Sequence, residues 1–114
     1  MGDNVGQLNF GAIISEDDCV KLQENPNLFN KKEGHFFYKE VDPKSLIRVF
    51  SPYETYDYLV VIRASNKISF NCSEQIDLDF SKAPKWTEQI ESFLNQYEIK
   101  PISKIGWILT GNYN

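Results

Sequence analysis

Cysteine and histidine are scarce in this 114-residue chain. The two cysteines, Cys19 and Cys72, and the single histidine, His35, are too few for a disulfide scaffold and lack the ligand spacing of a zinc site. Both cysteines are in phase with apolar neighbours, which predicts buried, reduced thiols and a cytoplasmic location. A Cys–His nucleophile pair would require one thiol to leave these apolar surroundings.

Long apolar runs, nucleotide-binding motifs and basic clusters are missing as well. No apolar stretch approaches the ~18 residues of a membrane span, and the first residues lack a signal-peptide pattern, so we expect no membrane attachment. The glycine motifs of nucleotide-binding proteins and hydrolases are absent. The basic residues are scattered and the formal net charge is −4, so direct nucleic-acid binding is not expected. These absences favour a binding protein over an enzyme, with no catalytic residue, no cofactor and no metal.

Aromatic residues, by contrast, are frequent, with eight Phe, six Tyr and two Trp making up 14% of the chain. Such side chains bury a large apolar area and are also enriched at recognition surfaces. With a pI near 4.9, the composition fits a protein whose partner is basic. The length predicts a single domain over residues 1–114.

Alternation of apolar and polar residues predicts the strands. Gly6–Ile14 is the first strand, and two hairpins should follow it. One joins His35–Val41 to Leu46–Phe50 through a turn containing Pro43. The other joins Tyr58–Ala64 to Lys67–Cys72. The same apolar phase resumes through Phe80, which indicates either one long strand bent by a bulge near Ser73-Glu74 or two strands that share a core face. Ser103–Thr110 is the last strand.

Two helices are expected between these strands. Ser15, followed by the acidic triplet Glu16-Asp17-Asp18, is typical of a helix start, and Asn25-Pro26-Asn27 should end this short helix. Pro84 marks the first turn of a longer helix. The predicted fold is therefore α+β, in the order β-α-β-β-β-β-α-β. It has one mainly antiparallel curved sheet of about five to six strands, with one short and one long helix on one face. The long helix has one apolar stripe: Trp86, Ile90, Phe93, Leu94 and Tyr97.

If both helices cover one face of the sheet, the other face needs an explanation. Leu59 and Val61 point away from the predicted core, and at least one of the contiguous rings Phe36, Phe37 and Tyr38 should do so too. An exposed apolar face usually indicates association with another molecule.

An acidic, tyrosine-rich loop precedes the strand that begins at Tyr58. Tyrosines offer contact area at low entropic cost and carboxylates give direction, so this loop resembles a recognition surface. Our first hypothesis is an inhibitor or immunity-type protein of a microbe or phage, which binds a basic protein partner. The alternative for the loop is a connecting lid that packs down on the domain. The interface candidates are Tyr53, Glu54, Tyr56, Asp57, Tyr58, Phe36 and Phe37.

Two other functions remain open at this point. A small-ligand-binding domain or minor enzyme could use a concave sheet face lined by aromatics such as Phe37, Tyr58 and Trp107. A structural homodimer could form through the uncovered sheet face.

Overall fold

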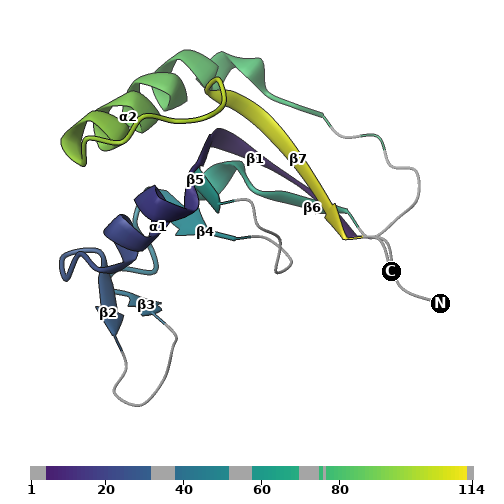
Figure 1. Ribbon diagram of the computed structural model, residues 1–114. Coiled ribbons are helices and arrows are strands. Elements are labelled where there is room, and N and C mark those ends of the chain that lie inside the picture. Colours follow the sequence, from purple (N-terminus) through teal and green to yellow (C-terminus); the bar gives the residue numbers. More distant parts are fainter. Residues whose placement is uncertain (1–4, 32–37, 52–57, 70–74, 76, 113–114) are drawn as a thin grey trace.

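The computed structural model describes residues 5–31, 38–51, 58–69, 75 and 77–112, and Figure 1 shows their arrangement. These residues form an α+β structure that contains a five-stranded sheet, a small two-stranded sheet and two α-helices. All strand pairings within both sheets are antiparallel. The predicted fold class is therefore confirmed, with the addition of the second sheet.

The first strand, β1 (Val5–Ile14), is the centre of the larger sheet. On one side it pairs with β7 (Gly106–Asn112) over seven residue pairs. On the other side it pairs first with β6 (Lys67–Ser69) and then with β5 (Tyr58–Ile62). The edge strand β4 (Ile47–Phe50) lies beside β5. Every other strand of this sheet except β4 is thus held by β1.

The predicted hairpin of Tyr58–Ala64 and Lys67–Cys72 is wrong. Its two strands both pair with β1, on the same side, and lie one after the other along it. The short 3₁₀ helix η2 (Arg63–Ser65) separates them, and the register against β1 shifts by the same three residues. The expected turn is therefore an insertion within one interrupted strand.

Side chains fill the interruption that η2 makes beside β1. The Ser65 hydroxyl accepts a hydrogen bond from Phe10 N at 2.7 Å and donates one to Ile62 O at 2.6 Å. The amide of Asn66 donates to Gln7 Oε1 and to Asn9 Oδ1, both at 2.9 Å. Because β1 has no strand beside Phe10 on this side, the Ser65 hydroxyl replaces the missing ladder partner.

Replacing Ser65 with alanine is expected to lower the free energy of unfolding by about 2 kcal/mol. The change leaves the buried N–H of Phe10 without its acceptor, and such unpaired groups cost about 1–3 kcal/mol. Urea denaturation measures the difference. The matched control is Ser92→Ala on the exposed side of the long helix, which should stay within about 0.5 kcal/mol of the native chain. Equal stability of the two variants would contradict the assigned role of the hydroxyl.

The predicted hairpin of His35–Val41 and Leu46–Phe50 is also wrong. The observed strand β3 (Tyr38–Glu40) pairs with β2 (Phe29–Lys31), and together they form the small sheet. β4 pairs with β5 instead, where Ile47 and Val49 lie opposite the buried Ile62 and Val60. Pairing β4 with β5 buries these apolar side chains, and this burial stabilises the structure more than the short connection of a β3–β4 hairpin would.

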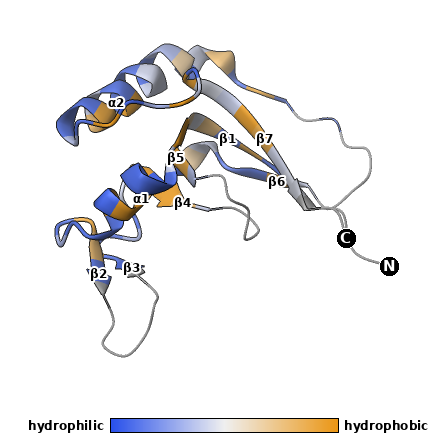
Figure 2. Cartoon of the chain, viewed as in Figure 1, coloured by the Kyte–Doolittle hydropathy of each residue, from blue (hydrophilic) through white to orange (hydrophobic). Residues whose placement is uncertain are grey.

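The helices begin largely as predicted. Ser15 Oγ accepts from Asp18 N at 3.2 Å and so caps α1 (Glu16–Gln23). The second helix, α2 (Ala83–Gln96), has Pro84 in its first turn, but its N-cap Lys82 makes no side-chain capping bond. The 3₁₀ helix η3 (Phe80–Lys82) precedes it. Figure 2 shows hydrophobic residues recurring along the otherwise hydrophilic α2.

One core joins both helices to the same face of the large sheet. β1 contributes Phe10, Ala12 and Ile14, α1 contributes Cys19 and Leu22, and α2 contributes Ile90 and Leu94. The remaining stripe residues of α2, Trp86, Phe93 and Tyr97, are partly buried against this core, which confirms the predicted stripe. Both helices therefore cover the same face, as expected.

An aromatic cluster joins three elements at the β7 side of this core. The ring of Phe10 in β1 lies 5.6 Å from that of Trp86 in α2 and 5.5 Å from that of Trp107 in β7. The two tryptophan rings are 5.9 Å apart, with an interplanar angle of 75°. Such tilted and edge-to-face pairs add to the stabilisation that comes from burial alone.

Two predictions about exposure are wrong. Leu59 and Val61 were expected on an uncovered face, but they are 0% and 1% exposed. On that face the Arg48 guanidinium lies 4.0 Å above the Phe50 ring. Leu59 pairs with Phe50, and Val61 pairs with Arg48, in the register of β4 and β5. Conversely, two residues of the apolar phase that was expected to continue the core are exposed, Ile68 at 50% and Phe80 at 67%, whereas Leu78 between them is partly buried.

Candidate functional site

Six of the seven predicted interface residues lie outside the described part of the chain: Tyr53, Glu54, Tyr56, Asp57, Phe36 and Phe37. The seventh, Tyr58, is the first residue of β5, opposite Ile14 of β1. Its side chain is partly buried and packs against the core. Tyr58 therefore contributes to the fold whether or not it also meets a partner.

A groove runs along β4, between the small sheet and α2. It consists of a cavity of about 260 Å³ and an adjoining, more open hollow of about 410 Å³, which share Ile47 and Phe93. We call it the β4 groove. The cavity is lined by Asn27, Leu28, Phe29, Glu40, Asp42, Ser45, Ile47, Val49 and Phe93. The hollow is lined by Leu46, Ile47, Glu88, Gln89, Ser92, Phe93 and Gln96.

The floor of the β4 groove is apolar. Ile47 and Val49 project from β4 on the side that faces α2, because they pair with the core residues Ile62 and Val60. Phe93 projects from the edge of the α2 stripe and is only partly buried. Covering a partly exposed phenylalanine and the aliphatic side chains beside it would lower the free energy of a complex with a partner.

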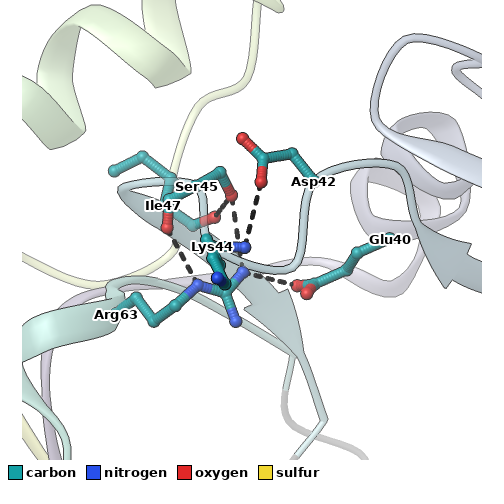
Figure 3. Close-up of polar contacts among 6 residues, drawn as sticks. All are labelled: Glu40, Asp42, Lys44, Ser45, Ile47 and Arg63. Atoms are coloured by element: carbon teal, nitrogen blue, oxygen red, sulfur yellow. Dashed lines mark hydrogen bonds and ion pairs between the residues drawn. The ribbon is translucent and has the colours of Figure 1, made fainter.

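Arg63 holds the rim of the groove in place (Figure 3). Its guanidinium donates to Glu40 Oε1 and to Ser45 O, both at 2.8 Å, and its backbone N–H donates to Leu46 O at 2.8 Å. The turn that carries Asp42 is closed by Lys44 N, which donates to Asp42 Oδ1 at 3.0 Å. One side chain from η2 thus fixes β3 and the β3–β4 turn against the large sheet.

The rim is acidic. Its described lining includes the carboxylates Glu40, Asp42 and Glu88, and no Lys or Arg side chain. Arg63 neutralises Glu40, whereas Asp42 and Glu88 have no ion pair among the described residues. These two carboxylates would attract a cationic side chain from a partner.

A buried acceptor without a hydrogen-bond partner lies in the groove, and a desolvated cation lies on the opposite face of β4. Gln89 Oε1, in the wall of the hollow, is buried and has no hydrogen-bond partner in the described ranges. A hydrogen bond from a donor would remove the free-energy cost of leaving this buried acceptor unpaired. In β4, burial lowers the pKa of Arg48, with Glu40 opposing and Arg63 adding to this shift.

Two potential nucleophiles among the described residues, the Ser45 hydroxyl and the Cys19 thiol, are engaged or buried. Two hydroxyls occur in the described lining of the groove, those of Ser45 and Ser92. The Ser45 hydroxyl donates to Ile47 O at 2.8 Å, so its proton is engaged with the backbone. Where the chain is described, no group of three His, Cys, Asp or Glu residues could hold a metal ion. Cys19 is buried, and burial together with nearby Glu16 raises the pKa of its thiol to about 11, which makes it a poor nucleophile.

Known proteins do not extend this description. No protein-family model, no curated protein and no solved structure matches the chain. Neither helix of the described ranges is long and apolar enough to cross a membrane. The class of protein is therefore defined by its own geometry: an α+β domain with an apolar groove rimmed by carboxylates.

Sequence patterns did not reveal this groove. Glu40 and Arg63 are 23 residues apart, and they meet only because β4 pairs with β5 and places the β3–β4 turn beside η2. The one available signal was Phe93, whose place at the edge of the α2 stripe indicates a side chain that the core covers incompletely.

Proposed function

We propose that this chain is a protein-binding domain of the inhibitor or immunity type, which binds a basic protein partner in the β4 groove. The observation that supports this function is the groove itself, in which a partly exposed Phe93 and Ile47 lie below unpaired carboxylates. Interfaces of this kind bury an apolar anchor at their centre and surround it with polar residues.

Charge and apolar contact would have separate roles in binding. The net charge of −4 would draw a basic partner toward the domain, and Asp42 and Glu88 would orient its lysine or arginine side chains. Phe93 would then bury apolar area against the partner. A donor from the partner could also satisfy Gln89 Oε1.

The acidic tyrosine loop remains part of this proposal. Residues 52–57 connect the end of β4 to the start of β5, so the loop is continuous in sequence with a wall of the groove. We propose that Tyr53, Glu54, Tyr56 and Asp57 extend the interface from there. Phe36 and Phe37, in the connection between β2 and β3, are proposed as its opposite margin.

A small-ligand role is the second candidate, supported by the enclosed part of the groove. That cavity combines the apolar Leu28, Phe29 and Val49 with polar groups from Glu40 and Ser45. Its volume of about 260 Å³ falls just below the roughly 300–1,000 Å³ of most ligand sites, so it would accept only a small molecule. A protein partner uses the whole groove and is the better fit.

The test is capture of proteins from a lysate of the native source on the immobilised chain, followed by mass spectrometry. We expect a basic protein that is retained at low salt and released at about 0.5 M NaCl, because screening weakens contacts between exposed charges. Its affinity for purified variants is then measured by calorimetry. Glu88→Lys, in the groove, should weaken binding at least about tenfold, which corresponds to roughly 1.4 kcal/mol.

The matched control is Glu91→Lys, which makes the same charge change on the exposed side of α2, outside the groove. It should bind like the native chain. Equal weakening by both substitutions would mean that net charge alone drives binding. Retention of an acidic partner, or of no protein at all, would overturn the proposal.

A further inference from the structure

The outer edge of β7 lacks the features that usually protect an edge strand. Within the described part of the chain, β7 pairs only with β1, which leaves one side of seven residues open. Its sequence, GWILTGN, contains no charged residue and no proline. Natural proteins place charges, prolines, bulges or short strands at such edges to prevent pairing with another chain. β7 is therefore suited to receive a further strand.

The side chain at the middle of β7 is also apolar and exposed. Leu109 is 71% exposed, although Trp107, two residues earlier on the same face, is held in the aromatic cluster with Trp86. α2 packs mainly against β1 and β5. Beyond Leu109, the cross-strand pair Gly6 and Gly111 has no side chains to cover it. The open edge thus carries an uncovered leucine at its centre.

We propose that β7 pairs antiparallel with β7 of a second copy of this chain, about a two-fold axis at Leu109. In that register Leu109 meets Leu109 of the second copy, and Ile108 lies opposite Thr110. Trp107 lies opposite Gly111, so the largest side chain of the strand faces the residue that leaves it most room. This large-to-small match about the centre of one strand is what makes the second copy the fitting occupant.

The proposed dimer is compatible with the rest of the fold. The two large sheets join into one continuous sheet, with both α2 helices on the same face and displaced from the junction. Since β4 is at the other side of the sheet from β7, both β4 grooves stay open at the outer edges. The dimer is independent of the proposed function, and it would present two grooves to partners.

Sedimentation equilibrium over a concentration series tests the dimer with the full chain. We expect a mass that rises with concentration toward twice the 13.2 kDa of one chain. Leu109→Lys places two ammonium groups opposite each other and should raise the dissociation constant at least about tenfold. The control Ile102→Lys alters a residue that is 69% exposed but lies outside β7, and it should dimerise normally. Circular dichroism should show both variants folded.

Disulfide trapping tests the register. With Cys72→Ser as background, Leu109→Cys should form a covalent dimer under mild oxidation, because residues paired across an antiparallel junction have Cα atoms about 4.5–5.5 Å apart. Thr110→Cys should not, since its symmetry mate would lie about 8 Å away. Cys19 is buried and stays out of the reaction.

Three results would overturn the proposal: a monomer at all concentrations up to about 1 mM, a dimer that Leu109→Lys leaves unchanged, or a dimer in which Leu109→Cys does not cross-link. The first means that the β7 edge remains unpaired, and the others place the contact elsewhere. Glu88→Lys should leave the dimer intact, so failure here is distinguishable from failure of the proposed groove.

Discussion

Replacing Phe10 with alanine is expected to lower the free energy of unfolding by about 3–5 kcal/mol. The ring is 4% exposed and contacts the rings of Trp86 and Trp107 at centroid distances of 5.6 and 5.5 Å. Its removal leaves a cavity between β1, α2 and β7. The backbone of β1 cannot close this cavity, because its neighbours on both sides hold it in register.

Urea denaturation, followed by circular dichroism, measures this loss. Tryptophan fluorescence gives a second readout, since both tryptophans of the chain lie in the cluster and should report the cavity in the folded state. The control is Phe80→Ala, at a ring that is 67% exposed, for which we expect a change within about 0.5 kcal/mol. If both variants unfold at the same urea concentration, the aromatic cluster does not stabilise the fold.

Local features of this fold could be predicted from the sequence, because they depend on neighbouring residues. The Ser15 cap needs only the N–H of Asp18, three residues away. The α2 stripe needs only the helical period, and all its members contact the core. In both cases the residues that decide the structure are within about three helical turns of each other.

Strand pairing could not be predicted in the same way. The sequence from Tyr58 to Ser69 has the alternation of a hairpin, but both of its strands are more stable when paired with β1, whose partner residues are 44 to 63 positions away in the sequence. No local pattern records that choice. The exposure of Leu109 has the same origin: it shares a face with Trp107, and only the position of α2 over β1 and β5 leaves it uncovered.

The candidate groove depends on those long-range pairings. Glu40, Ser45 and Arg63 come from β3, the β3–β4 turn and η2, and they meet only after β4 has paired with β5. Composition did suggest an acidic protein with a basic partner. It could not indicate which carboxylates remain without a cation, because Arg63 neutralises Glu40 through a contact that only the fold creates.

Replacing Gly11 with alanine should be nearly as damaging as the loss of Phe10. Gly11 lies where β1 pairs with β5 on one side and with β7 on the other. A Cβ atom at this position would lie 1.9 Å from Val60 O and 2.7 Å from Val61 Cα. Both are backbone atoms of a paired strand, so the methyl group can be accommodated only if β1 and β5 move apart. We expect a loss of about 3 kcal/mol or more in the free energy of unfolding.

The residue directly opposite provides the matched control. Gly106 of β7 pairs with Gly11, but a Cβ atom added there meets nothing within 4 Å. Gly106→Ala should therefore be neutral, or stabilise by up to about 1 kcal/mol, because alanine restricts the unfolded chain more than glycine does. The same substitution on two paired residues should thus shift the urea midpoint strongly in one case only. If Gly11→Ala and Gly106→Ala unfold at the same urea concentration, then the backbones of β1 and β5 are not in close contact at Gly11, and the assigned packing at the centre of the sheet is wrong.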